Sequence, residues 1–189
     1  MFCKTTIAIL ALAAALPAAA AEVYVGDPAH TYAYFETGHL GISWVHGRFN
    51  KTTAARVMLD RTAGTGSIDV VIDTASVDTG HDARDKHLRS ADYLDVEKFP
   101  TLAFKSNVLK FAGDSLVGVD GDLTLMGVTR PVSLNVTSFL CIQHPVNKKH
   151  MCGAAAATSI KRSAWGIKRG AAGIGDEVKI SIQIEAYKE

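Results

Sequence analysis

The sequence predicts an all-β fold, an antiparallel sandwich or barrel, on three observations. Short segments alternate apolar and polar residues with period two, which is typical of strands that bury one face. Turn signals such as Gly64-Thr65-Gly66 and Gly113-Asp114 separate these segments. The 16 glycines among 189 residues suit a chain with many turns. The length corresponds to about one domain, which is large enough to bury a core of its own.

The clearest strand is the last, where alternate positions from Val178 to Ala186 are apolar. Alternation also marks residues 117–125 and 132–137, and Met126-Gly127-Val128-Thr129 predicts a hairpin turn between them. Shorter apolar patterns complete a set of about eight or nine strands, near residues 32–35, 44–49, 57–59, 68–72, 102–104 and 154–160. The segment from His81 to Phe99 lacks this period and predicts one or two short helices across one end of the sheet.

The first 21 residues have the pattern of a secretory signal peptide. Lys4 precedes an apolar run from Ile7 to Leu16, and Pro17 and four alanines lead to a cleavage site after Ala21. The alternative is a membrane anchor, but the run is shorter than the ~20 residues that a span needs. We therefore expect a signal peptide at 1–21, a single domain at 22–189 without a transmembrane anchor, and a periplasmic location.

Charge and composition exclude two classes of protein. The chain has 20 basic and 19 acidic residues, whereas a nucleic-acid-binding protein normally carries a basic stripe, so we expect no nucleic-acid partner. A hydrophobic content of 48% with 21% charged residues argues against disorder.

Two cysteines remain after cleavage, Cys141 and Cys152. Export favours a disulfide between them, because the compartment outside the cytoplasm is oxidising. Two alternatives stay open: free thiols, or a zinc site in which His144 and His150 complete the ligands. The spacing of these four residues does not match a zinc motif.

Motifs of common catalytic and cofactor sites are missing from the sequence. It contains no Gly-x-Ser-x-Gly elbow, no His-Glu-x-x-His pair and no phosphate-binding loop. His81 and Asp85 have a spacing of four that suits metal ligation, but no further ligands are evident nearby. We therefore predict no catalytic residues, no metal and no cofactor.

Arg84, Arg162 and Trp165 leave two interpretations open. An arginine can bind a carboxylate or phosphate through its forked guanidinium, or it can pair with a neighbour such as Asp85 and close the fold structurally. Trp165 can plug a core or contact a ligand.

Several motifs, taken together and in order, resemble those of the YceI-like family of exported lipocalin-like proteins associated with polyisoprenoid binding. They span nearly all of residues 22–189, with Trp165 and Tyr93-Leu94 as departures. The motifs are Asp27-x-x-His30, Phe35, His39-Leu40-Gly41, Gly47-x-Phe49, Arg84-Asp85-x-His87-Leu88-Arg89-Ser90-x-Asp92-Tyr93-Leu94-Asp95, Phe99-Pro100, Phe104-x-Ser106, Gly121-Asp122-Leu123-Thr124-Leu125-x-Gly127-Val128-Thr129-x-Pro131-Val132, Arg162-Ser163-x-Trp165-Gly166 and Gly175-Asp176.

The resemblance implies an extended eight-stranded antiparallel lipocalin-like barrel that holds a long apolar molecule inside. On this basis we expect an apolar tunnel lined by Phe35, Val45, Phe49, Ile72, Leu88, Tyr93, Phe99, Leu102, Phe104, Leu123, Leu125 and Trp165. We expect the head group of the ligand to meet residues from the set His39, Arg84, Asp85, His87 and Arg162.

The expected function is a carrier or reservoir for an isoprenoid lipid. Ten buried CH₂ groups contribute about 8 kcal/mol, so a long tail binds without many polar contacts. Two alternatives remain: a filled barrel that acts as a stress-response or interaction protein, and an enzyme that acts on a lipid. A homodimer is a further expectation, in which a second barrel covers the tunnel mouth.

Overall fold

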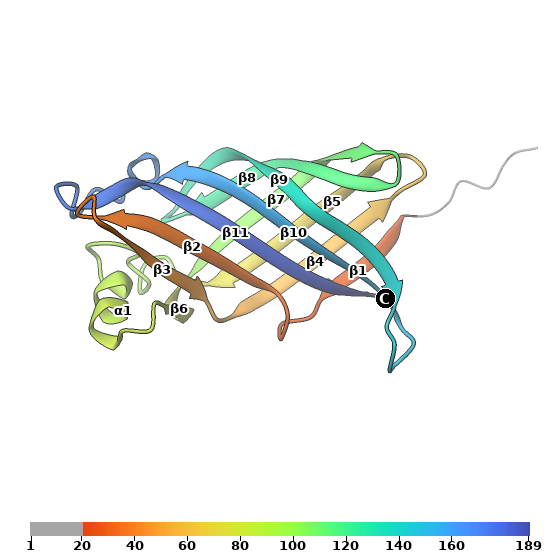
Figure 1. Ribbon diagram of the computed structural model, residues 1–189, viewed down its shortest axis with the longest axis horizontal. Coiled ribbons are helices and arrows are strands. Elements are labelled where there is room, and N and C mark those ends of the chain that lie inside the picture. Colours follow the sequence, from red (N-terminus) through yellow and green to blue (C-terminus); the bar gives the residue numbers. More distant parts are fainter. Residues whose placement is uncertain (1–20) are drawn as a thin grey trace, which may run out of the picture.

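Eight antiparallel strands close into a barrel in the computed structural model, which describes residues 21–189 (Figure 1). Neighbouring strands follow the order β1, β4, β5, β7, β8, β9, β10 and β11, and β11 pairs back to β1. The predicted signal peptide lies, except for its last residue, outside the described residues. The strands of the ring are β1 (Glu22–Gly26), β4 (Thr52–Asp60), β5 (Thr65–Asp73), β7 (Thr101–Ala112), β8 (Ser115–Leu125), β9 (Val128–Gln143), β10 (His150–Lys161) and β11 (Ile174–Lys188).

Three more strands extend the wall at one end of the barrel: β2 (Tyr32–His39), β3 (Ser43–Phe49) and β6 (Val77–Asp78). β11 pairs with β1 only near its carboxyl end, and β2 takes over as its neighbour along the rest of its length. β3 pairs with β2, and β6 pairs with β3 and ends the sheet. Strand pairing is therefore continuous around the barrel at the end that contains β1, which we call the closed end. At the other end β6 leaves a free sheet edge, and we call this the open-edged end.

The helical residues gather at this open-edged end. The helix α1 (Asp82–Arg89) and the 3-10 turn η1 (Thr74–Ser76) flank β6, and a second 3-10 turn, η2 (Arg162–Trp165), follows β10. Figure 1 shows α1 beside β6 and β3, at the opposite end from the carboxyl terminus. The expected lipocalin-like barrel with a short helix at one end is confirmed.

Local sequence explains most of these elements. Met126 and Gly127 form the two-residue connection between β8 and β9, and both have positive φ, 50° and 72°. Such turns match the twist of a hairpin, so the hairpin predicted here is confirmed. The short strands β1 and β6 were not predicted, because neither has enough residues to show a period.

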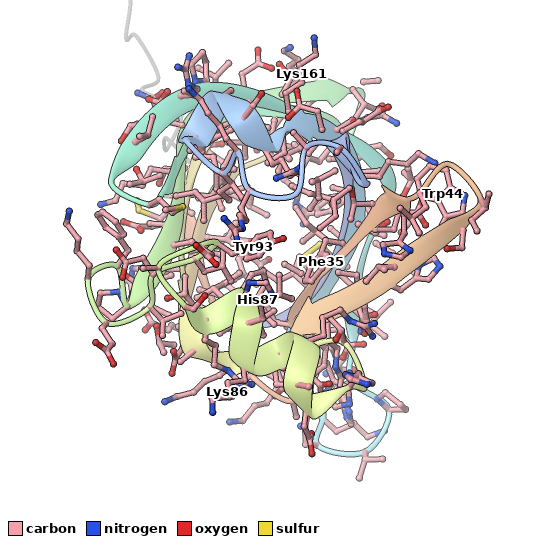
Figure 2. All side chains as sticks on the ribbon, turned by 90° about the vertical axis from the view of Figure 1, so that its left-hand side faces the viewer. Phe35, Trp44, Lys86, His87, Tyr93 and Lys161 are labelled. Carbon is pink, nitrogen blue, oxygen red and sulfur yellow. A yellow bond between two sulfur atoms is a disulfide. The ribbon has the colours of Figure 1, made fainter. Side chains whose placement is uncertain are left out.

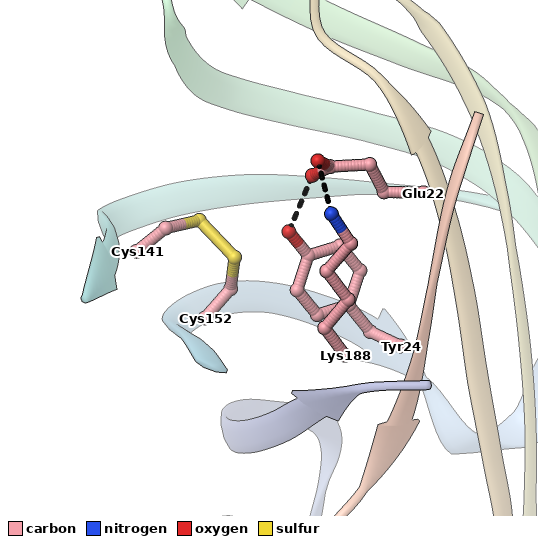
Figure 3. The surroundings of a disulfide bond; sticks show 5 residues. All are labelled: Glu22, Tyr24, Cys141, Cys152 and Lys188. Carbon is pink, nitrogen blue, oxygen red and sulfur yellow. Dashed lines mark hydrogen bonds and ion pairs between the residues drawn. A yellow bond between two sulfur atoms is a disulfide. The ribbon is translucent and has the colours of Figure 1, made fainter. Parts of the chain in front are cut away.

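The predicted disulfide is present and links neighbouring strands near the closed end (Figure 3). Cys141 on β9 lies directly opposite Cys152 on β10, with a Cα–Cα distance of 4.0 Å. Both cysteines are therefore joined in the disulfide, and the zinc and free-thiol alternatives do not apply to this structure.

The same end carries a partly exposed polar cluster that joins β1 to β11. The hydroxyl of Tyr24 and the ammonium of Lys188 both donate to the carboxylate of Glu22, at 2.6 Å each. Burial, and next the bond to Glu22, raises the pKa of Tyr24 to about 12. The bonds from Lys188 and Tyr24 lower the pKa of Glu22. Figure 3 shows this cluster near the disulfide, so the β1–β11 contacts and the disulfide between β9 and β10 lie at the same end of the barrel.

Removing the disulfide is expected to destabilise the barrel without changing its shape. The two cysteines are 11 residues apart, and closing a loop of this size contributes about 3 kcal/mol in the chain-entropy model. Urea denaturation of the Cys141→Ala/Cys152→Ala variant measures the loss. Reductant should lower the stability of the natural chain to that of the variant and leave the variant unchanged. A natural chain that is insensitive to reductant would contradict the prediction.

Candidate ligand-binding cavity

The barrel encloses a cavity of about 620 Å³ in the half that contains α1. Its wall is mostly aliphatic and aromatic, and the volume lies within the range of known small-molecule sites. The apolar lining comes from nine strands, from α1 and from the loops after α1 and η2: Ala33, Phe35, Trp44, Val45, Phe49, Ile72, Val77, Leu88, Leu94, Leu102, Phe104, Leu123, Leu125, Val132, Leu134, Ile160, Ile167, Ile174, Val178, Ile180 and Ile182.

The period of two in the strands produces this wall. On β11, Val178, Ile180 and Ile182 face the cavity, while Lys179 between them is exposed and bonds to Glu36. In a sandwich the apolar face of a strand packs against the other sheet, whereas in a closed barrel it faces the lumen. The apolar face predicted from alternation is therefore the cavity wall.

The cavity reaches the surface at the α1 end. Ser43 and Trp44 on β3 and His87 on α1 line it and are also exposed. Figure 2 looks into this end, where His87, Tyr93 and Phe35 lie around the opening and Trp44 projects to one side. We call this opening the mouth.

Polar groups of the lining collect around the mouth. We call the set His39, Ser43, Arg84, His87 and Arg162 the polar rim, and all five line the cavity. They come from the ends of β2 and β3, from α1 and from η2. The site is therefore amphipathic, with an apolar interior and a polar rim at its mouth.

Capping and charge hold α1 in place over the mouth. His81 caps the first turn by accepting a hydrogen bond from the backbone N–H of Arg84 at 3.2 Å. Asp82 and Asp85 lie in the first turn and basic residues in the last, which favours the helix dipole. Arg89 donates to the carbonyls of Ala75 and Val77, at 2.8 Å each, and ties the helix to β6.

Arg84 and Asp85 meet at a third residue, Thr79. The backbone N–H of Thr79 donates to the buried Asp85 carboxylate at 2.9 Å, and its hydroxyl donates to the same oxygen. Arg84 donates to the Thr79 hydroxyl at 2.7 Å and to its carbonyl at 3.0 Å. Two of the five guanidinium N–H groups are thus used in fixing Arg84, and the side chain still lines the cavity.

Arg162 is buried and serves as the centre of the loop between β10 and β11. Its guanidinium donates to four backbone carbonyls, those of Gly175 (2.8 Å), Ile167 (2.9 Å), Arg169 (2.8 Å) and Ile174 (3.0 Å). Four of its five N–H groups are therefore committed to the loop.

Asp176, near the start of β11, stabilises the start of η2. Its carboxylate accepts from the backbone N–H of Ser163 at 2.9 Å and from the Ser163 hydroxyl at 2.8 Å. These bonds, with a smaller contribution from the charge of Arg162, lower the pKa of Asp176. Hydrogen bonds of Arg162 and Asp176 thus hold the β10–β11 loop both where it leaves β10 and where it enters β11.

A chain of polar contacts crosses the mouth from α1 to the β10–β11 loop. His87 lies edge-on to the ring of Tyr93 at 4.9 Å, and its Nε2 is 3.2 Å from the carboxylate of Asp92. The same carboxylate lies 3.7 Å from Nε of Arg169. Because all of these groups are partly exposed except Tyr93, the contacts are weak individually.

A second, smaller cavity of about 130 Å³ lies toward the disulfide end. Tyr24, Leu59, Val119 and Cys152 are among the residues that line it. The two cavities share four lining residues, Ala33, Ile72, Leu134 and Ile182. They therefore adjoin along the barrel axis.

The structure brings most of the predicted site residues to one cavity. From the predicted tunnel and head-group sets, those in the wall are Phe35, Val45, Phe49, Ile72, Leu88, Tyr93, Leu102, Phe104, Leu123, Leu125, His39, Arg84, His87 and Arg162.

Three predicted residues lie behind the wall instead. Trp165 is only 4% exposed, and its indole N–H donates to the carbonyl of Leu123 at 3.2 Å, so it packs in the core. Phe99 lies against the β8–β9 turn at Gly127. Asp85 faces Thr79, because a buried carboxylate requires hydrogen-bond donors.

The sequence interpretation missed lining residues that lie on strands it had identified. Val178, Ile180 and Ile182 belonged to the predicted buried face of the last strand, and that alternation was sufficient to place them in a barrel lumen. Trp44 and Ser43 carried no such signal, because their role depends on where the β2–β3 hairpin meets the mouth.

Two features are absent from the described residues. Within residues 21–189, no three His, Cys, Asp or Glu side chains cluster in a way that could hold a metal ion. Nor does any helix in this range have the length and apolar character needed to cross a membrane.

The family model for the YceI-like domain matches residues 24–186. The chain belongs to the YceI-like family. The UPF0312 protein of Pseudomonas aeruginosa (strain LESB58) is 35% identical over 191 aligned positions, covering 98% of this chain and 99% of the relative. Protein YceI of Escherichia coli O157:H7 is 36% identical over 160 positions, covering 85% of this chain and 83% of the relative.

Solved structures agree with this assignment. BcnA of Burkholderia cenocepacia superimposes with a TM-score of 0.70 at 25% identity, over 85% of this chain and 98% of BcnA. A polyisoprenoid binding domain from Saccharophagus degradans has a TM-score of 0.62 at 22% identity, over 88% of this chain and 98% of that domain. This second likeness shows a shared fold.

Proposed function

We propose that this YceI-like protein is exported to the periplasm and carries or stores a long isoprenoid lipid inside the barrel. The observation on which the proposal rests is the apolar cavity of about 620 Å³ with a polar rim at its mouth. The match to the YceI-like family and the shared fold with a protein described as a polyisoprenoid binding domain support the choice of ligand.

The size of the cavity agrees with a long, flexible tail. At about 30 Å³ for each group of the size of a water molecule, 620 Å³ holds roughly twenty such groups. Burial of each CH₂ contributes about 0.8 kcal/mol, so half of this capacity already suffices for micromolar affinity before the cost of association. The filled-barrel alternative predicts an interior packed with side chains, and a cavity of about 620 Å³ argues against it.

Arg84 is the cation best suited to a head group. Arg162 uses four of its five N–H groups within its own loop, whereas Arg84 uses two on Thr79. His39 and His87 complete a set of donors around the mouth. Such a rim suits the carbonyl oxygens of an isoprenoid quinone or the oxygens of a polyprenyl phosphate.

Export and assembly state complete the proposal. The signal-peptide pattern of residues 1–21 supports a periplasmic site of action. The homodimer remains a prediction, and sedimentation velocity of the mature chain tests it.

Native mass spectrometry of the mature chain after mild purification tests the lipid-binding function. We expect a mass addition that corresponds to one isoprenoid lipid per barrel, and renewed uptake when a stripped sample is offered an isoprenoid quinone. Recovery of a shortened or oxidised lipid would instead favour the enzyme alternative. A chain that neither retains nor takes up a lipid would overturn the proposal.

A further inference from the structure

The tip of the β2–β3 hairpin exposes large apolar side chains beside the mouth. Leu40 is 61% exposed, Ile42 84% and Trp44 53%. Leu40 and Gly41 have φ values of 54° and 70°, which form the tight turn that presents these side chains. The N–H of Leu40 also donates to the carbonyl of Gly173 at 2.6 Å, which ties the tip to the β10–β11 loop.

The large side chains of this tip are exposed to solvent instead of packing in the core. Apolar side chains scattered singly on a surface are ordinary, but three adjacent ones at the rim of a cavity form a patch typical of an interaction site. Figure 2 shows Trp44 projecting from the hairpin, away from the core and beside the opening. We call Leu40, Ile42 and Trp44 the apolar tip.

Cations without acidic neighbours in sequence flank the apolar tip. The segment 157–175, which includes the β10–β11 loop, has no acidic residue and exposes Lys161, Lys168 and Arg169. Residues 37–59, which include the tip, also have no acidic residue. Asp92, on the α1 side of the mouth, is the carboxylate that reaches Arg169, at 3.7 Å. Two carboxylates that border these segments are engaged by neighbours, Glu36 by Lys179 at 2.9 Å and Asp176 by Ser163. The face thus combines exposed apolar groups with the exposed cations Lys161, Lys168 and Arg169.

This combination fits an anionic lipid surface. Tryptophan is enriched at membrane interfaces, where its ring lies at the level of the head groups. Apolar side chains that enter the interface supply binding strength, and nearby lysine and arginine side chains add attraction to anionic lipids. Lys179 lies 4.3 Å from the centre of the Trp44 ring, but it is paired with Glu36 at 2.9 Å, so the cations available to a lipid are those of the β10–β11 loop.

A second exposed apolar hairpin lies at the other end of the barrel and serves as a comparison. The β9–β10 hairpin exposes Leu140, Ile142 and Val146, and Lys148 and Lys149 are nearby. It has the same kind of composition, but the exposed residues that line the large cavity are at the α1 end. Because the apolar tip is continuous with the mouth, it is the better candidate of the two hairpins for an interaction surface.

We propose that the apolar tip and the cations of the β10–β11 loop dock the protein on an anionic phospholipid bilayer. In this orientation the mouth faces the membrane, and a lipid can pass between bilayer and cavity without its tail crossing water. The inference goes beyond the proposed function, because docking requires an exposed face and not an occupied cavity.

Vesicle co-sedimentation of the mature chain, stripped of lipid, tests the docking. The vesicles are equimolar phosphatidylethanolamine and phosphatidylglycerol, with pure phosphatidylcholine for comparison. We expect binding to the anionic vesicles that weakens in high salt, and Ile42→Asp should weaken it about tenfold or more. Lys168→Gln and Arg169→Gln should each weaken it roughly fivefold.

Trp44 supplies a second readout that does not depend on sedimentation. The chain has two tryptophans, and Trp165 is 4% exposed while Trp44 is 53% exposed. A blue shift of the emission on adding vesicles, and quenching by brominated acyl chains, would therefore report Trp44 entering the interface. The shift should be absent from Ile42→Asp.

Val146→Asp is the matched control, because Val146 is 81% exposed on the opposite hairpin. We expect this variant to bind vesicles as the natural chain does. Equal losses in Ile42→Asp and Val146→Asp, or no binding by the natural chain, would overturn the inference. Lipid uptake from detergent is measured separately, and its failure would count against the proposed function alone.

Discussion

The Arg162→Ala variant is expected to lose about 3–5 kcal/mol of unfolding free energy, the largest effect of any single substitution we predict. The guanidinium is buried and donates to four backbone carbonyls between residues 167 and 175. Alanine removes all four charge-assisted bonds at once. An unpaired buried acceptor costs about 1–3 kcal/mol, and water reaching the loop reduces the sum.

Two further arginine variants separate this network from a general effect of lost charge. Arg130→Ala is the matched control, because Arg130 is exposed and donates one bond, to the carbonyl of Ala164 at 2.7 Å. It should cost less than about 1 kcal/mol. Arg162→Lys keeps the charge but not the planar fork, so it should recover only part of the loss.

Urea denaturation measures these losses, and amide hydrogen exchange locates them. The amides of residues 166–174 should lose protection in Arg162→Ala, while those of the closed end near β1 keep theirs. A loss no greater than that of Arg130→Ala would show that the four bonds do not support the loop, and the structural role assigned to Arg162 would be wrong.

Arg162 also illustrates where interpretation of the sequence ends. The residue stood out as a cation in an apolar chain, but its partners are carbonyls, which carry no sequence signal. Whether Arg162 contacts a head group or supports the fold therefore depends on the path of the loop, which the sequence does not reveal. Trp165 is similar, because its acceptor is the carbonyl of Leu123, 42 residues earlier in the chain.

Strands with a period of two were the predictable part of the fold. β11 follows its pattern from Val178 to Ala186, where one face of the strand is apolar and the other is polar, and the pattern is broken before Val178 by a register shift. The pattern alone does not distinguish a packed sandwich from a hollow barrel, because hollowness depends on strand number and stagger. The family resemblance, and not the periodicity, indicated the barrel.

The short elements escaped prediction because tertiary pairing creates them. β1 has five residues and pairs with β4 and with the carboxyl end of β11, more than 150 positions away in the chain. β6 has two residues and pairs with β3. Asp85 was placed at the head group on charge alone, whereas its burial against Thr79 depends on how α1 meets β6.

Filling the junction between the two cavities is expected to shorten the longest lipid tail that the barrel accepts. Ala33 on β2 lines both cavities, together with Ile72, Leu134 and Ile182. It is the smallest side chain of the four, so Ala33→Phe adds a ring where the cavities adjoin. A tail that enters from the mouth would then end in the larger cavity.

The magnitude follows from the volume that is cut off. The smaller cavity of about 130 Å³ holds about four groups of the size of a methylene. At about 0.8 kcal/mol each, their loss costs roughly 3 kcal/mol, or about a hundredfold in affinity. Prenols that fill only the larger cavity should bind Ala33→Phe as they bind the natural chain.

A series of prenols of increasing length, bound to the natural chain and to Ala33→Val, Ala33→Leu and Ala33→Phe, measures this limit. The length at which affinity stops rising should fall with each larger side chain. Ala157→Phe is the control, because Ala157 is on β10 and lines neither cavity. If all variants keep the same length limit, the tail does not pass Ala33, and the smaller cavity has no part in binding.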